Sequence, residues 1–250
     1  MPSLLDKLSY RMARVLPSAT VHGSGFGPIV SFTFDDAPPS AATTGAAILE
    51  EFGLRGTFYL SGGWLDHCGD VQSTMTSAQA RDLARRGHEI ACHSYTHLDL
   101  SHRDWAAIEE DLDLNRRALS ALAGATPRHF AYPFGHANCT AKRRLQSRFL
   151  TCRGITPGVN AGRIDLGLLK AVDVSGASRN DARIADWIAA NIKRSGWLIF
   201  FTHDVQDAPT PYGARPDEFR GIVKAALASG ATCLTVGAAT ARLLDQPKAA

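Results

Sequence analysis

The chain has 250 residues, of which 45% are hydrophobic and 20% are charged, a composition typical of a globular protein and not of a disordered one. Its formal net charge of +3 is small for this length, so the composition gives no reason to expect a nucleic-acid partner. No stretch approaches the roughly 20 apolar residues that a transmembrane helix needs.

Residues 1–20 carry apolar side chains at helical spacing, with charged side chains between them. They lack the uninterrupted apolar run of a secretory signal, so we expect an amphipathic helix. Two alternatives stay open for this helix: it packs on the protein, or it lies on a membrane surface. We divide the chain into this helix with its glycine-rich connection, residues 1–28, and one domain, residues 29–250.

The five cysteines are widely and irregularly spaced, with no CxxC pair. This pattern favours free thiols in a reducing compartment. Together with the absence of a recognisable signal or transmembrane segment, it predicts a cytoplasmic protein, either free or at a membrane surface. The composition leaves the oligomeric state open.

Beyond residue 28, short β-prone runs alternate with amphipathic helices. The predicted strands are residues 29–34, 56–60, 88–92, 128–132, 149–152, 168–174, 197–202 and 231–236. The predicted helices are residues 40–52, capped by Ser40 and stopped by Gly53, 78–86, capped by Thr76 and Ser77, and 105–123, 181–194, 217–229 and 238–244. Seven or eight strands in this alternation predict an α/β fold with a mostly parallel sheet, open or closed into a barrel. Polar residues follow several strand ends, which favours the barrel.

Two carboxylates and two imidazoles end two of these strands. Asp35 and Asp36 are adjacent, so in an extended backbone they point to opposite sides and only one can readily be a metal ligand. His93 and His97 are four residues apart, the spacing that places two imidazoles on one face of a helical turn. Two imidazoles and one carboxylate around an open position are typical of a catalytic zinc site.

Three motifs in order, TFDD at 33–36, GHEIACHSYTH at 87–97 and FTHD at 201–204, resemble those of the NodB-like polysaccharide deacetylases, carbohydrate esterase family four. The resemblance covers residues 29–244 and implies an irregular (β/α) barrel of the NodB-homology type. It implies that Asp36, His93 and His97 bind a divalent metal, zinc or else cobalt or nickel. It also implies that Asp35 is the general base and His203 the general acid.

The implied reaction is hydrolysis of an N-acyl amide, most simply N-acetyl, on a sugar or glycan by metal-activated water. The family pattern also implies that a backbone N–H near the oxyanion is supplied by the aromatic residue after the proline, here Phe134.

The sequence departs from the family pattern at two places. Ala131 stands where an arginine that holds the base is expected, and Arg153 or Arg163, around the loop 154–162, is a candidate for that guanidinium or for substrate contacts. The fourth motif lacks its tryptophan, although Asp173 is a candidate to orient His203.

Two tyrosines are further candidates for the substrate pocket. Tyr132 is either a pocket residue or a packed aromatic residue, and Tyr212 lies in a Pro- and Gly-rich loop that could fold over substrate.

Three other functions stay open. The site could deacylate or deformylate another amide or a lipid-linked sugar, or the domain could bind carbohydrate and metal without catalysis. A non-haem iron oxygenase also uses two histidines and one carboxylate, but the alternation of strands and helices does not favour its usual all-β scaffold.

Overall fold

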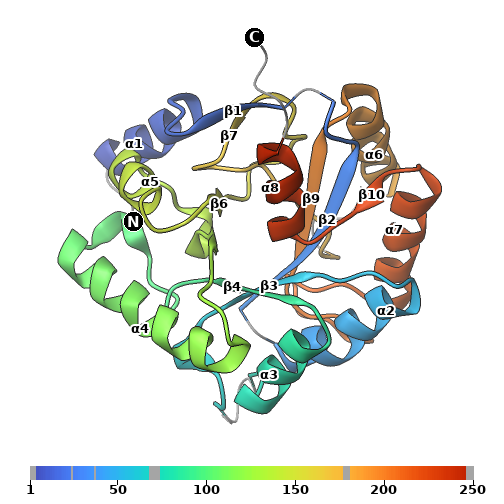
Figure 1. The fold of residues 1–250 in the computed structure, drawn as a ribbon, viewed down its shortest axis with the longest axis horizontal. Coiled ribbons are helices and arrows are strands. Elements are labelled where there is room, and N and C mark those ends of the chain that lie inside the picture. The colour runs from blue at the N-terminus through green and yellow to red at the C-terminus, as the bar shows by residue number, and fades with distance from the viewer. Residues whose placement is uncertain (1–3, 24, 37, 68–73, 177–180, 246–250) are drawn as a thin grey trace.

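The computed structural model describes residues 4–23, 25–36, 38–67, 74–176 and 181–245, and eight of its strands form one parallel sheet (Figure 1). The strands of this sheet are β2 (Ile29–Asp35), β3 (Thr57–Leu60), β4 (Glu89–Cys92), β5 (His129–Ala131), β6 (Thr151–Arg153), β8 (Val172–Asp173), β9 (Trp197–Thr202) and β10 (Thr232–Cys233). Their order is β6-β5-β4-β3-β2-β9-β8, with β10 paired to the start of β2. Every carboxyl end on this path therefore faces the same way.

The main chain around Leu169 closes the sheet into an irregular barrel. Leu169 N–H donates to the Cys152 carbonyl at 2.8 Å, and the Leu169 carbonyl accepts from Gly154 N–H at 2.9 Å. Three residues later, Val172 pairs with Phe200 of β9 at the opposite edge. The segment thus bridges the two edge strands, as the predicted barrel requires.

Helices surround the barrel, and one of them covers the end at which its strands start (Figure 1). The N–H groups of Val236 and Gly237, in the first turn of α8, donate to the side chains of Thr57 and Glu89, which begin β3 and β4. The helices are α1 (Leu4–Val15), α2 (Ala46–Glu51), α3 (Ser77–Arg85), α4 (Trp105–Ala123), α5 (Cys139–Leu145), α6 (Asp181–Arg194), α7 (Pro216–Ala228) and α8 (Val236–Leu244). Closure at this end leaves the carboxyl ends of the strands for chemistry.

Successive side chains along the strands point alternately outward, toward the helices, and inward, into the barrel, so the hydrophobic core is divided into separate clusters. The outward rings of Phe32, Phe34 and Phe58 pack beneath the helices, and those of Phe34 and Phe58 stack with centroids 4.7 Å apart. The inward residues of the central strands form a second cluster in which Ala91 and Ala131 are small. Since Asp35 has the same parity in β2 as the inward-facing Ile29, it points into the barrel.

Several predicted boundaries are confirmed: α4, α6 and β9 have the predicted limits, and Thr76 caps α3 in a capping box. The helix predicted for residues 40–52 is different, because a π-helical segment, Ala41–Gly45, precedes α2. Ser40 is not its cap; Ser40 is itself helical, and its hydroxyl accepts from Val205 N–H.

Two short strands were not predicted. β1 (Thr20–Gly23) and β7 (Gly162–Asp165) pair antiparallel beside the barrel; β1 overlaps the start of the predicted glycine-rich connection, and β7 begins at the last residue of the loop 154–162. Four of the cysteines are free thiols, as predicted, whereas Cys68 lies outside the described residues. The boundary placed at residue 28 remains a prediction.

The end of α1 is fastened to the barrel by a buried lysine. Lys142 of α5, 1% exposed, donates from Nζ to the carbonyls of Ala13 at 2.6 Å and Leu16 at 2.7 Å. The same ammonium lies 2.5 Å from the Asp165 carboxylate at the end of β7. A cation at the carboxyl end of a helix also interacts favourably with the helix dipole.

Replacing this lysine should destabilise the protein. We expect Lys142→Met to lower the free energy of unfolding by about 3 kcal/mol, because Asp165 loses its buried partner and two helix carbonyls lose their donor. Urea unfolding measures the loss, with the exposed Lys193→Met on α6 as a control that stays within about 0.5 kcal/mol. A loss below about 1 kcal/mol for Lys142→Met would contradict this role.

Candidate metal centre and catalytic cleft

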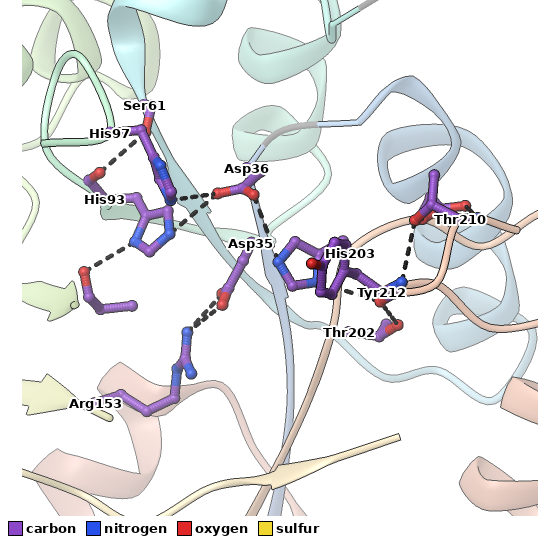
Figure 2. Close-up of polar contacts among 12 residues, drawn as sticks. Asp35, Asp36, Ser61, His93, His97, Arg153, Thr202, His203, Thr210 and Tyr212 are labelled. Carbon is purple, nitrogen blue, oxygen red and sulfur yellow. Dashed lines mark hydrogen bonds and ion pairs between the residues drawn. The ribbon is translucent and has the colours of Figure 1, made fainter. Parts of the chain in front are cut away.

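Asp36, His93 and His97 converge at the carboxyl end of the barrel (Figure 2). Asp36 Oδ1 lies 3.1 Å from His93 Nε2 and 3.2 Å from His97 Nε2. Among the described residues this is the one cluster of three or more candidate ligands that could surround a metal ion. The structure thus brings together all three predicted ligands.

The donor set fits a divalent metal ion. Asp36 Oδ1 is buried and has no hydrogen-bond partner of acceptable geometry, although two imidazole nitrogens stand close to it. The three atoms therefore face a common point. Burial alone would raise the pKa of the Asp36 carboxyl, but His93 and His97 outweigh burial and hold this pKa far below its usual range. A carboxylate is the form that binds metal.

A main-chain carbonyl sets the orientation of His93. Its Nδ1 lies 2.9 Å from the carbonyl oxygen of Ala131, which can only accept, so Nδ1 carries the proton. Nε2 is then left with a lone pair directed at the candidate centre, the arrangement that histidine ligands usually have. The residue at position 131 thus contributes through its backbone and not through its side chain.

The two histidines lie in a loop, not on the helical turn that their spacing predicted. Both Ser94 and His97 have positive φ values, 61° and 55°, which no α-helix contains. Asp111 of α4 holds the loop by accepting from the N–H groups of Tyr95 at 2.6 Å and Thr96 at 3.0 Å. Asp111 lies in the helix that follows the loop, and no local sequence pattern linked it to the two histidines.

Asp35, the residue before Asp36, lies beside this centre and pairs with Arg153 (Figure 2). Arg153 Nη2 lies 2.6 and 2.5 Å from the two Asp35 oxygens. Arg153 is completely buried, and its guanidinium lies between the rings of Tyr59 and Phe201, at 5.0 and 4.9 Å from their centroids. Arg153 is therefore too enclosed for the predicted substrate contact and instead supplies the guanidinium that position 131 lacks.

The other arginine candidate, Arg163, lies on β7, exposed, and lines a separate surface pocket. It is not part of this site. Ala131 and Arg153 are direct neighbours in the register of β5 and β6. The guanidinium thus comes from one strand further along the sheet than the family pattern implies.

His203 follows β9, and its Nε2 lies 3.5 Å from Asp36 Oδ2. Its Nδ1 is 3.2 Å from the carbonyl oxygen of Tyr212, which also accepts from His203 N–H and from the Thr202 hydroxyl. Asp173 does not orient this imidazole as predicted; its carboxylate accepts from Ser175 N–H within its own turn. A backbone carbonyl therefore fixes Nδ1 as the protonated nitrogen and turns Nε2 toward Asp36 of the candidate metal centre.

A buried carboxylate shapes the loop that supplies this carbonyl. Asp204, 2% exposed, accepts from Thr210 N–H at 2.9 Å and from its hydroxyl at 2.5 Å. Gly213 packs directly on the carboxylate, since a Cβ there would lie 2.3 Å from Asp204 Oδ1. Loop and imidazole are thus held as one unit.

Two aromatic side chains flank an open cleft of about 530 Å³ beside the candidate metal centre. Trp64 packs its ring 4.7 Å from that of His97, and Tyr212, 63% exposed, lies 5.4 Å from the His203 ring. Trp64 was not predicted as a site residue, although it follows β3 by four residues, at the end of the barrel where polar side chains follow the strands. Tyr212 lines the cleft, where the prediction put it.

The loop after β5 contributes a third aromatic ring. Phe134 has a left-handed backbone, φ 57°, and its half-exposed ring lies 4.4 Å from the His97 ring. Tyr132, by contrast, is not a pocket residue; its side chain is 1% exposed, and its hydroxyl donates to the Gly167 carbonyl. Of its two open alternatives, the packed aromatic residue is correct.

Comparison with known proteins gives the same assignment from the sequence. The family model for polysaccharide deacetylases matches residues 23–151. The chain is 33% identical over 119 residues to a chitooligosaccharide deacetylase of Sinorhizobium fredii and 29% identical over 115 residues to a chitin deacetylase of Pestalotiopsis. These matches cover 46% of the chain in both cases, and 52% and 37% of the relatives. The chain thus spans about half the length of these relatives or less.

Solved structures share the fold at low identity. A polysaccharide deacetylase structure from Mycobacterium smegmatis, described as putative, aligns with a TM-score of 0.61 at 20% identity, over 94% of this chain and 98% of that one. A family 4 acetyl xylan esterase from Clostridium thermocellum, solved with a cobalt ion, aligns with a TM-score of 0.60 at 23% identity, over 85% and 90%. With the family match over more than half of its residues, the chain belongs to the polysaccharide deacetylase family.

Proposed function

We propose that this protein is a metal-dependent deacetylase that removes an acetyl group from an N-acetylated sugar within a glycan. The observation that carries the proposal is the arrangement around Asp36: two imidazole nitrogens at one carboxylate oxygen, and His203 Nε2 at 3.5 Å from the other. Asp35, the candidate base, is the adjacent residue. The family match and the named deacetylases among the relatives support the same reaction.

The metal ion would be held by Asp36 and the Nε2 atoms of His93 and His97. Two imidazoles and a carboxylate suit zinc, and the same donors accept cobalt or nickel. A bound divalent ion would polarise the acyl carbonyl and acidify a water molecule. The cobalt ion in the related esterase structure supports this choice of metals.

Asp35 would act as the general base on the attacking water. Its carboxylate is 4% exposed and is oriented by Arg153, so the chain presents one fixed oxygen geometry to the reacting molecule. The positive guanidinium also keeps a buried carboxylate from being left without a partner. Arg153 would thus be a positioning residue that acts through Asp35.

His203 would protonate the leaving amine. Nδ1–H of His203 donates to the Tyr212 carbonyl. When the imidazole is protonated, the proton on Nε2 is therefore the one that it can transfer to the amine. The left-handed turn at Phe134 would present its N–H to the developing oxyanion. These groups approach the scissile amide from different strand ends, as in other barrel enzymes.

The cleft favours a glycan over a small free amide. Trp64 and Tyr212 present aromatic surface beside the centre, and rings of this kind pack against the apolar faces of sugars while their polar edges stay hydrated. A non-catalytic carbohydrate-binding domain would need neither the buried Asp35–Arg153 pair nor the oriented His203. Other acylated sugars, including lipid-linked ones and xylan acetyl esters, are the remaining alternatives within this chemistry.

The decisive test is a substrate screen with the zinc-loaded protein. We expect acetate release from N-acetylglucosamine oligomers, loss of release with a chelator, and recovery with added zinc, cobalt or nickel. Acetylated xylan and N-formylated sugars run in parallel to identify the acyl group and the bond. Absence of turnover on all of them, with zinc bound, would contradict the enzyme proposal.

Metal content gives a second readout that does not depend on finding the substrate. Asp36→Ala should lose both zinc and activity, whereas Asp35→Asn should retain zinc and lose activity about 10²–10⁴-fold. His22→Ala, on β1 away from the centre, should retain both.

A lysine at position 153 should not restore the function of the buried arginine. We expect Arg153→Lys to lower kcat at least about tenfold with KM little changed, because an ammonium lacks the planar group that packs on the two rings and the second donor, Nη1, that bonds the Gly154 carbonyl, and so is not held against Asp35 in the same way. The matched control is Arg163→Lys, which should match the wild type. In the Asp35→Asn background, Arg153→Lys should have no further effect on kcat; an additive effect would mean that Arg153 does not act through Asp35.

The side chain and the carbonyl of Tyr212 should have separable effects. Tyr212→Ala should raise KM for an oligosaccharide about tenfold and leave kcat within about threefold, because the ring is lost while the carbonyl that orients His203 remains. Tyr212→Phe, which keeps the ring, is the matched control. Steady-state kinetics on oligomers of increasing length make the comparison. An unchanged KM for Tyr212→Ala would exclude a role for the Tyr212 ring in binding the sugar.

A further inference from the structure

A surface that shares no residue with the lining of the proposed catalytic cleft combines exposed cations with exposed apolar side chains. Arg14 of α1, Arg163 of β7 and Lys170 line a pocket of about 230 Å³ together with Val15. All three cations are exposed, and none of them forms an ion pair within the described part of the chain.

The single acid among the described residues that line this pocket is already neutralised. Asp165 lies 2.5 Å from Lys142 Nζ and also accepts from Gly167 N–H at 3.1 Å. It therefore does not compensate the three cations at the rim. The pocket therefore presents net positive charge to solvent, and dissolved ions, not acidic side chains of the pocket lining, screen this charge.

Apolar side chains stand directly beside the cations. Val15 is 78% exposed, Leu16 50% and Met12 45%, which are high values for large aliphatic residues. Met12 and Val15 are three residues apart and so share one face of α1, and Arg11 and Arg14 form a parallel row next to them. Lys142 fastens the end of this helix, so the row is held in place and is not a loose arm.

We infer that this surface, Arg11, Met12, Arg14, Val15, Leu16, Arg163 and Lys170, docks on an anionic lipid bilayer. Clustered cations attract the negative leaflet, and adjacent apolar side chains can enter the headgroup region, the combination that reversible peripheral binding needs. Within the described residues, no helix is long and apolar enough to cross a bilayer, so the contact would be at the surface. The inference does not depend on the proposed deacetylase activity.

Vesicle co-sedimentation of the full chain tests the charge component. We expect binding to phosphatidylcholine vesicles that contain 30% phosphatidylserine, weak binding to pure phosphatidylcholine, and loss of binding in about 0.5 M salt. Arg14→Ala/Arg163→Ala/Lys170→Ala should weaken binding roughly 100-fold, about fivefold for each cation. The matched control removes three exposed cations from other helices, Arg81→Ala/Arg117→Ala/Lys224→Ala, and should bind as the wild type.

The apolar component has its own pair of variants. Val15→Ser/Leu16→Ser should weaken binding at least about tenfold, whereas Leu114→Ser/Leu227→Ser, on α4 and α7, should not. Because none of these residues touches the cleft, acetate release from a soluble oligosaccharide should stay within about twofold for every variant. That readout separates failure of docking from failure of the proposed function.

Three results would overturn the inference. Equal binding of the wild type and the cation variant to anionic vesicles would show that these cations are not used. Saturable binding of inorganic phosphate without vesicle binding would make the pocket a phosphate site. A concentration-dependent dimer that Val15→Ser/Leu16→Ser converts to monomer, with no vesicle binding, would assign the surface to a second copy of the chain.

Discussion

The buried ion pair between Asp35 and Arg153 is the constraint on which the candidate site depends. Both side chains are inside the barrel, where an unpaired charge would cost several kcal/mol, so each needs the other to be present in its charged form. Small inward residues, above all Ala131, leave the volume that the guanidinium fills. The guanidinium packs on the rings of Tyr59 and Phe201, so the pair lies where the proposed base must hold one orientation. We take this as the reason why a hydrophobic barrel contains a charge pair at the carboxyl ends of its strands.

Two adjacent aspartates have different surroundings because the backbone turns between them. Asp35 ends β2 and follows its inward alternation, whereas Asp36 has a left-handed φ of 66° that directs its carboxylate toward the histidine loop. The loop in turn adopts positive φ values at Ser94 and His97, stabilised by Asp111 from α4. Strained backbone at a site, supported by hydrogen bonds from a rigid helix, is the usual cost of precise side-chain placement.

Backbone carbonyls orient two imidazoles of the candidate site, those of His93 and His203. The carbonyls of Ala131 and Tyr212 fix the protons of His93 and His203 on Nδ1, so Nε2 of each ring faces the Asp36 carboxylate of the candidate centre. A carbonyl can only accept a hydrogen bond, so it selects the tautomer without adding a titratable group to the site. Side-chain identity at positions 131 and 212 is then free to serve other needs: volume in one case and an aromatic surface in the other.

The sequence by itself determined the alternation of strands and helices and the limits of α4, α6 and β9, because hydrophobic period and capping residues are local signals. The spacing of His93 and His97 also made them candidate metal ligands, whereas the choice of Asp36 over Asp35 rested on the family resemblance. Only the tertiary structure decided which arginine meets Asp35, since that depends on the register of β5 with β6 and on the volume left by Ala131. It also decided that Tyr212 orients His203 while Asp173 does not, and that Asp111 supports the histidine loop. Contacts between residues far apart in sequence arise from packing, which no local pattern records.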